Sequence, residues 1–257
     1  MPSRAQAKRW RALKRRKGRA EHGLFLAEGH RLVSDLLDSG IAVRHLLYTD
    51  RADEEPDAAA VLERAREADV PAERVDRGEL AEFADTVTPQ SVLAVGEIPT
   101  RERSDLAGGD LVVLDAVQDP GNAGTILRTA EALGAAGAVS LKGTVDLWNP
   151  KTVRASAGAL FRLPVLDDEW PEAGRWIRAA GLPLWAADAE GEGVGRGDRV
   201  PGRVALVLGN EGAGVREAIL EAADRRVAVR LPGGAESLNV AVAAALLMDR
   251  IFSARRA

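Results

Sequence analysis

Two glycine-rich loops near the C-terminal end dominate this sequence: residues 206–214 read LVLGNEGAG, and residues 231–240 read LPGGAESLNV before an apolar helical segment that reaches residue 252. Glycine has no Cβ, so such loops can bring backbone N–H and C=O groups close to a ligand. Neither loop has the Gly-Lys-Ser/Thr of a P-loop or the glycine spacing of a dinucleotide fingerprint. Taken alone, the first loop also fits an ordinary tight turn between a strand and a helix.

Apolar runs alternate with helical segments from residue 111 onward. Continuous apolar runs are typical of strands that are buried on both faces of a parallel sheet. The alternation predicts an open, doubly wound α/β sheet with its ligand beyond the carboxyl ends of the strands, where the glycine loops fall. A polar stretch with glycines at 191, 193, 195 and 197 is predicted to be a loop. The predicted strands are 111–115, 138–141, 182–186, 204–208 and 227–231, and the predicted helices are 123–133, 153–161, 172–180, 215–222 and 237–252.

The first hundred residues predict a separate, smaller α/β unit. Charged and glycine-rich residues at 99–109 are typical of a linker, so we expect domains at 1–98 and 110–257. Within the first domain the pattern predicts helices at 3–17, around residues 32–37, at 57–68 and at 79–84, and strands at 43–48, around 75 and at 92–97.

Composition excludes several classes of protein. The chain has 257 residues, of which 46% are apolar and none is cysteine, which excludes disulfides, thiol catalysis and cysteine-bound zinc. It has no apolar run of about 18 residues and no N-terminal segment with the pattern of a signal peptide. We therefore expect a cytoplasmic protein.

A basic block at the N-terminus indicates contact with nucleic acid, although the formal net charge is −4. Such a block attracts phosphate by releasing condensed counterions, but a solvated basic tail is an alternative. We expect Trp10, inside the block, to pack against the domain rather than stack on a base. The first twenty residues contain no acidic residue and nine basic ones: Arg4, Lys8, Arg9, Arg11, Lys14, Arg15, Arg16, Lys17 and Arg19.

A third segment, residues 119–130, opens a helix with Asn122 in its first turn and carries Arg128. Each residue has a local alternative, since Asn122 could be an N-cap and Arg128 a solvated side chain. Ser237 could likewise cap the last helix, with Asn239 in its first turn.

Together these segments resemble the SpoU/TrmH family of RNA ribose 2′-O-methyltransferases, within the SPOUT superfamily. Asn-x-Gly-x-x-x-Arg-x-Ala at 122–130 matches the first family motif, Gly-x-Glu-Gly-x-Gly at 209–214 the second, and residues 231–243 the third. Residues 151–165 also match; there packing is the default, and RNA contact through Arg154 is secondary. Phe25 and Glu28-Gly29 give a looser likeness to a ribosomal-protein-L30-like domain.

The resemblance implies a parallel-sheet SPOUT domain with a deep trefoil knot, a homodimer, and S-adenosyl-L-methionine held bent by the loops, with no metal. It implies 23S ribosomal RNA as the substrate; alternatives are tRNA and a noncatalytic RNA-binding protein. A nucleotide-binding oxidoreductase is disfavoured because its phosphate fingerprint is missing. The implied catalytic residues are Asn122, Arg128, Glu211 and Asn239, the cofactor-binding residues are Leu208, Gly209, Asn210, Gly214, Leu231, Pro232, Ser237 and Leu238, and the RNA-binding residues are Lys8, Arg9, Arg11, Lys14, Arg15, Arg16 and Arg154.

The proton acceptor is an open question, because every histidine and the one tyrosine lie before residue 50. The remaining choices are Glu211, another carboxylate, Lys142, Lys151 or an arginine. A guanidinium scarcely loses its proton. We therefore expect Arg128 to clamp a phosphate and stabilise the developing alkoxide, with proton loss to phosphate or water.

Overall fold

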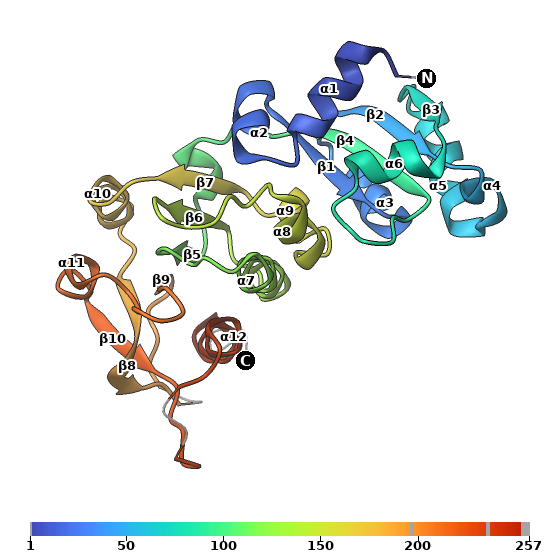
Figure 1. The fold of residues 1–257 in the computed structure, drawn as a ribbon. Helices are drawn as coiled ribbons and strands as arrows, with labels where there is room; N and C mark the ends of the chain where they lie inside the picture. The colour runs from blue at the N-terminus through green and yellow to red at the C-terminus, as the bar shows by residue number, and fades with distance from the viewer. Residues whose placement is uncertain (1, 196–197, 235–236, 253–257) are drawn as a thin grey trace. The chain divides into compact units, whose positions relative to one another are not determined.

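A computed structural model describes residues 2–195, 198–234 and 237–252 (Figure 1). The chain divides into two compact units, one of residues 1–100 with 148–161 and the other of residues 101–147 with 162–257. The segment 148–161 differs from the predicted domain boundaries, because it lies in the sequence of the second domain but packs with the first unit.

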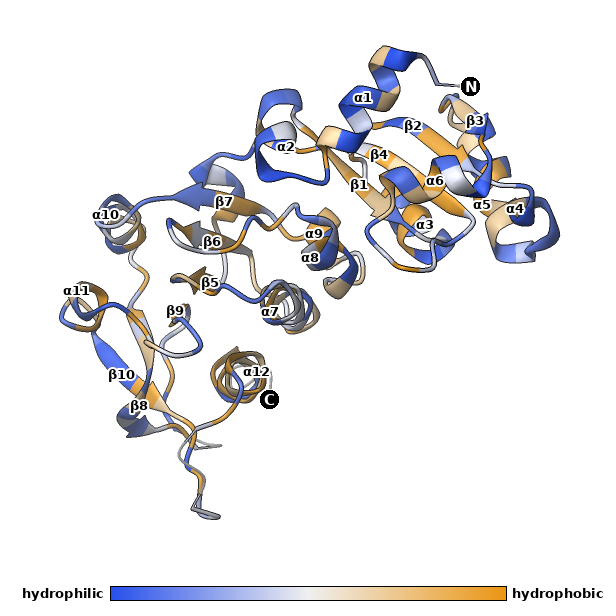
Figure 2. Cartoon of the chain, viewed as in Figure 1, coloured by the Kyte–Doolittle hydropathy of each residue, from blue (hydrophilic) through white to orange (hydrophobic). Residues whose placement is uncertain are grey.

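The first unit is built on a four-stranded sheet of order β1-β4-β2-β3, in which β4 is antiparallel to both neighbours and β2 is parallel to β3. Figure 2 shows apolar residues concentrated on β2 and β4. The strands are β1 (Leu24–Glu28), β2 (Val43–Tyr48), β3 (Ala72–Arg74) and β4 (Val92–Glu97), and the helices are α1 (Arg4–Ala12), α2 (Arg16–His22), α3 (His30–Asp38), α4 (Arg51–Glu54), α5 (Pro56–Glu67), α6 (Arg77–Phe83) and α8 (Pro150–Ala155).

Aromatic side chains form much of this unit's core. Phe25 of β1 packs against Trp148 and Phe161, with ring centroids 4.7 and 5.6 Å apart. Trp10 is 3% exposed and contacts Phe83 edge-on at 5.8 Å, so the expectation that it packs against the domain is confirmed.

The prediction of one helix over residues 3–17 is wrong. The chain turns between α1 and α2, and Gly18 lies so close to α1 that a Cβ there would come within 2.1 Å of the Ala12 carbonyl oxygen. The buried Arg19 donates a hydrogen bond from Nη1 to the Leu13 carbonyl at 2.6 Å. This turn depends on tertiary contacts that the run of basic residues does not reveal.

The second unit is a parallel sheet of six strands in the order β10-β8-β9-β5-β6-β7. Its strands β5, β6 and β9 are buried along their whole length, as the apolar runs predict. The strands are β5 (Leu111–Leu114), β6 (Gly137–Leu141), β7 (Val165–Asp168), β8 (Leu184–Gly193), β9 (Ala205–Leu208) and β10 (Arg225–Ala228), and the helices are η1 (Arg103–Leu106), α7 (Pro120–Ala132), α10 (Glu172–Ala179), α11 (Glu217–Leu220) and α12 (Val240–Phe252). The short helix α9 (Ala159–Arg162) belongs to the first unit except for its last residue.

The glycines at 191 and 193 lie in β8 and not in the predicted loop, while Gly197 is outside the described residues. Val227 and Ala228 of β10 pair with Glu192 and Gly193. A Cβ on Gly191 would meet the Val227 nitrogen at 2.7 Å. Close approach of the neighbouring strand therefore explains Gly191, whereas a Cβ on Gly193 would lie 2.3 Å from Nε of the Arg230 side chain.

The predicted helix at 153–161 is also divided, into α8 and α9, at Ala157 and Gly158, whose φ angles are +46° and +81°. No helix in the described part of the chain is long and apolar enough to cross a membrane.

Because β5 and β9 are parallel neighbours, the segments that leave their carboxyl ends meet at one edge of the sheet. These segments are residues 115–119 and 209–216, which include the second motif and the approach to the first.

Candidate cofactor and catalytic site

The loop at 209–214 is closed by its own backbone. The Asn210 N–H donates to the Gly214 carbonyl at 2.9 Å, and the Gly214 N–H donates back at 3.0 Å. The Asn210 side-chain oxygen accepts from Gly212 N and Ala213 N, both at 3.0 Å. A Cβ on Gly209 would lie 2.2 Å from the Gly214 carbonyl carbon, and Gly214 has a φ of +72°. Glycine is therefore required at both ends for loop closure itself.

Asp115 fixes this loop to the end of β5. It is fully buried, and its carboxylate accepts from Arg216 N at 2.8 Å and from Arg216 Nε at 2.6 Å. Asn210 Nδ2 also donates to the Ala116 carbonyl at 2.9 Å. A buried carboxylate needs such charged and backbone donors. The sequence analysis did not single out Asp115; an acidic residue directly after a buried apolar run was the available signal.

A chain of hydrogen bonds joins the three motifs. The Glu211 carboxylate accepts from Gln118 N at 3.1 Å, Asp119 N at 3.0 Å and Asn122 Nδ2 at 3.0 Å. Asn122 Oδ1 in turn accepts from Asn239 Nδ2 at 2.9 Å. Three of the four predicted catalytic residues are thus in direct contact, and we call Asn239, Asn122 and Glu211 the motif relay.

The residues that cap α7 and α12 are not the two that the sequence suggested as N-caps, Asn122 and Ser237. Asp119, not Asn122, caps α7, because its side chain accepts from Asn122 N at 2.8 Å. Asn239, not Ser237, occupies the cap position of α12, where its Oδ1 accepts from Ala241 N at 2.9 Å, so this helix begins at Val240 and not at residue 237. The amide of Asn122 is therefore left for the relay.

Glu211 is a carboxylate at neutral pH. Partial burial acts to raise its pKa, but hydrogen bonds from the Asn122 side chain and from backbone N–H groups, including those of Asp119 and Gln118, outweigh burial and hold the pKa below its ordinary value of 4.5. A carboxylate stabilised in this way is a weak base, so Glu211 orders its neighbours rather than taking a proton.

A pocket lies beside the closed loop. Of the predicted cofactor-binding residues, Leu208 is buried in β9 and Pro232 is not among the lining residues. Sequence reasoning missed residues 187–189 of β8 and 227–229 at the end of β10, which belong to no recognisable motif. It also missed Val240 and Ala243, which lie within the third motif, and Leu247 further along α12. The predicted residues that do line the pocket are Gly209, Asn210, Gly214, Leu231, Ser237 and Leu238.

Arg128 lies outside both the pocket lining and the relay. It is exposed on α7, and its side chain forms no hydrogen bond or ion pair with any residue that the structure describes. Its guanidinium is thus free for a substrate group. Lys142, another candidate for proton transfer, lies 3.4 Å from Glu169.

The predicted RNA-binding residues fall into two sets. Arg11 Nε donates to Glu82 at 2.6 Å, Lys14 Nζ donates to the Glu82 carbonyl at 3.3 Å, and Arg154 donates to Asp85 at 3.0 Å from a largely buried position. The other set is exposed and, among the described residues, has no ion-pair partner: Lys8, Arg9, Arg15 and Arg16.

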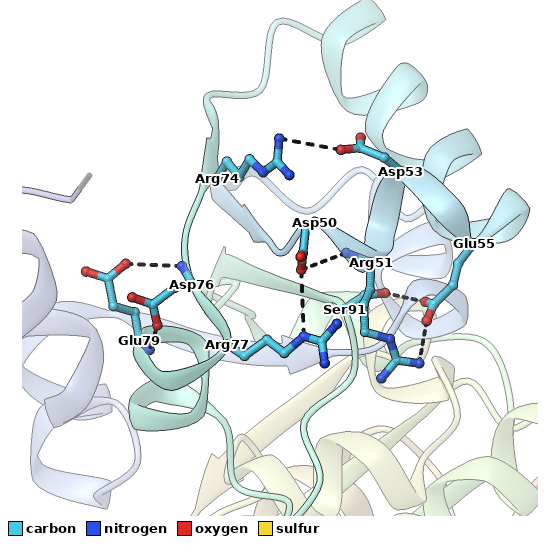
Figure 3. Close-up of polar contacts among 9 residues, drawn as sticks. All are labelled: Asp50, Arg51, Asp53, Glu55, Arg74, Asp76, Arg77, Glu79 and Ser91. Carbon is cyan, nitrogen blue, oxygen red and sulfur yellow. Dashed lines mark hydrogen bonds and ion pairs between the residues drawn. The ribbon is translucent and has the colours of Figure 1, made fainter.

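Several arginines elsewhere in the first unit are matched by carboxylates. Arg51 lies 2.8 Å from Glu55, Arg74 3.9 Å from Asp53 and Arg77 3.7 Å from Asp50, and Figure 3 shows these three pairs. The unpaired charge of Lys8, Arg9, Arg15 and Arg16 gathers on α1, α2 and the turn between them.

The fold and the three joined motifs define an α/β methylase of the SpoU type. The sequence model of the SpoU rRNA Methylase family matches residues 110–249, and that of the MRM3-like substrate binding domain matches residues 4–94. The chain belongs to the SpoU rRNA methylase family.

Relatives agree along almost the whole chain. It is 35% identical to the 23S rRNA (guanosine(2553)-2′-O)-methyltransferase RlmP of Bacillus subtilis, over 95% of this chain and 94% of that protein. The crystal structure of the SpoU methyltransferase AviRb from Streptomyces viridochromogenes with AdoMet has a TM-score of 0.86 and 31% identity, covering 99% of both chains. An AdoMet-bound rRNA methyltransferase from Sinorhizobium meliloti has a TM-score of 0.84 and 32% identity, covering 100% of this chain and 97% of that one.

Replacing Glu211 by Gln should loosen the motif relay, because the amide cannot accept hydrogen bonds at both of its terminal atoms. Since Glu211 is exposed, we expect a loss of about 1 kcal/mol in unfolding free energy at pH 7. A folded-state pKa below 4.5 means that the contribution of Glu211 is fully present above that pH and is lost as pH falls through the lower, folded-state pKa.

Urea unfolding at pH 7 and at pH 3 measures both effects. The difference in stability between wild type and Glu211→Gln should shrink in acid, whereas Glu172→Gln, an exposed glutamate of α10, should change stability little at either pH. If the stability difference between wild type and Glu211→Gln grew on acidification, the lowered pKa assigned to Glu211 would be contradicted.

Proposed function

We propose that this protein transfers a methyl group from S-adenosylmethionine to a ribose 2′-hydroxyl of ribosomal RNA. The observation that carries the proposal is the motif relay, which joins residues from three distant segments beside a pocket at the carboxyl ends of the strands. RlmP and other relatives that act on rRNA support the reaction and the substrate.

The pocket has the chemistry that the cofactor requires. Leu231, Leu238, Val240 and Leu247 offer apolar surface to an adenosyl group, and the loop backbone offers hydrogen-bonding groups. When bound, S-adenosylmethionine supplies the methyl: its carbon–sulfur bond breaks with the electron pair left on sulfur, a carbon–oxygen bond forms to the ribose, and the hydroxyl proton goes to phosphate or water.

The relay residues position the acceptor. In each of Asn122 and Asn239, one Nδ2–H is engaged within the relay, which leaves a second amide N–H for a ribose or phosphate oxygen. The Glu211 carboxylate fixes the Asn122 amide orientation. Arg128, with five donors and no partner among described residues, holds the adjacent phosphate and stabilises the alkoxide as it forms.

The threaded knot, the L30-like nature of the first domain, the homodimer and a cytoplasmic location belong to the same proposal. Residues 231, 237 and 238 line the pocket together with the 209–214 loop, as a C-terminal segment returning through the preceding loop would. Val242 and Leu246 on α12 are 49% and 36% exposed, which favours a second copy of the chain against this helix.

Incubation with tritiated S-adenosylmethionine tests the reaction and the class of RNA. We expect label in 23S rRNA and at most a trace in tRNA, and alkaline hydrolysis should stop at the modified ribose because its 2′-oxygen is blocked. Label confined to tRNA would reassign the substrate. RNA binding without label would leave a noncatalytic RNA-binding protein.

Arg128→Lys should lower kcat about 100-fold, because lysine keeps the charge but loses the planar, multi-donor clamp. Affinity for the cofactor should stay within about twofold, since Arg128 does not line the pocket. Arg175→Lys, an exposed arginine of α10 paired with Glu172, is the matched control. Near-normal turnover by Arg128→Lys would remove the case for the clamp.

The unpaired basic residues of the first unit should set the salt dependence of RNA binding. Each lost phosphate contact reduces the slope of log K against log salt by about 0.7–0.9. Fluorescence anisotropy with an rRNA fragment should therefore show a salt dependence that is shallower than that of the wild type, by about 3 in slope, when Lys8, Arg9, Arg15 and Arg16 are all replaced by alanine.

A fourfold variant with the same loss of charge is the control. Its arginines are exposed but each is paired with a carboxylate, so its slope should change by less than about 1. An equal change in both variants would show that net charge, and not the N-terminal set, governs binding. The control residues are Arg44, Arg51, Arg74 and Arg77.

A further inference from the structure

The charged side chains that line the pocket beside the 209–214 loop are all negative. Among the described residues that line it, the only charged side chains are Asp188 and Glu211, and both are carboxylates. The remaining lining is apolar, backbone or neutral polar. A ligand that carries positive charge therefore meets two negative groups and no positive one in this part of the chain.

The two carboxylates differ in the number of hydrogen bonds that they accept. Glu211 accepts hydrogen bonds from Gln118 N, Asp119 N and Asn122 Nδ2 and orders the relay. Asp188 lies on β8 with 18% of its side chain exposed, and from the described residues its carboxylate accepts one hydrogen bond, from Glu190 N at 3.1 Å.

The cation nearest to Asp188 neutralises it only in part. Arg226 Nη1 lies 3.7 Å from the Asp188 carboxylate, beyond hydrogen-bond distance. The same guanidinium lies 3.6 Å from Glu217, donates to the Leu220 carbonyl at 3.4 Å and is 43% exposed. Arg226 is thus shared between two carboxylates and solvent, and it does not line the pocket.

We propose that Asp188 is a specificity residue that makes this pocket favour the methyl donor over the spent cofactor. The inference rests on the proposed function, in which the donor carries a positive sulfonium and the product, S-adenosylhomocysteine, a neutral thioether in its place. Opposite charges a few ångströms apart attract strongly in a partly buried site. The attraction from Asp188 acts on the donor and is lost once the methyl has left, which favours release of the product.

Titration calorimetry with three ligands tests the inference without any turnover. The ligands are S-adenosylmethionine, S-adenosylhomocysteine and sinefungin, which has a charged amine where the donor has its sulfonium. An opposite charge within about 4–6 Å shifts a protonation equilibrium by one unit or more, and a loss of that size corresponds to about tenfold in affinity. Asp188→Asn should therefore weaken both cationic ligands about tenfold. Binding of S-adenosylhomocysteine should change by less than about twofold.

Two further variants separate charge from structure. Arg226→Gln removes the partial neutralisation of Asp188, so it should widen the preference for the cationic ligands, opposite to Asp188→Asn. Glu192→Gln removes the same charge from the same strand, but Glu192 is 74% exposed, lies outside the pocket lining and pairs with Arg225, so the preference should not change.

The outcomes are distinct. Equal weakening of all three ligands by Asp188→Asn would overturn the inference, because it would place the carboxylate against the ribose or the amino-acid part that the ligands share. No weakening of any ligand, or the same shift in Glu192→Gln, would overturn it as well. If the wild-type protein binds none of the three, the proposed function fails, whereas normal binding of all three with an unchanged preference in Asp188→Asn fails this inference alone.

Discussion

The carboxylate of Glu211 is the interaction on which the site depends. Its two oxygens accept hydrogen bonds from the backbone after β5 and from Asn122 on α7, and Asn122 accepts from Asn239 at the start of α12. One side chain thus ties together segments that are about ninety to one hundred and twenty residues apart. Without Glu211, no side chain of the relay would link the glycine loop to the first turn of α7 and, through Asn122, to the cap of α12.

In this arrangement the relay residues hold the site in place, and a different residue, Arg128, is left to act on the substrate. The relay uses most of the hydrogen-bonding capacity of its members on one another, and the low pKa of Glu211 makes it a poor proton acceptor. The guanidinium of Arg128, by contrast, has no hydrogen-bond or ion-pair partner among the described residues. A reaction that needs alignment of three atoms and stabilisation of a developing alkoxide is suited to such a rigid frame with one free, multi-donor cation.

Membership of the SpoU rRNA methylase family, inferred from motifs at 122–130, 209–214 and 231–243, is confirmed by the family match over residues 110–249. The parallel sheet is confirmed as well, because buried strands leave continuous apolar runs in any sequence. The prediction of one helix over residues 3–17 was wrong. The turn before Arg16 is held by the close approach of Gly18 to α1 and by the hydrogen bond from Arg19 to the Leu13 carbonyl. The prediction of a loop over the glycines at 191 and 193 was wrong because β8 extends through them and pairs with β10 at Glu192 and Gly193.

The sequence by itself determined the family, the alternation of strands and helices, and the polar residues that form the relay, because these depend on local chemistry and on residue order. Only the tertiary structure decided how those residues are used. It gave Asp119 the capping role, which leaves the Asn122 side chain to join the relay. It also anchored the glycine loop on Asp115 and paired Arg11, Lys14 and Arg154 with acidic or carbonyl groups. Such assignments depend on which groups meet across the fold, and a hydrogen-bond partner a hundred residues away leaves no trace in local sequence.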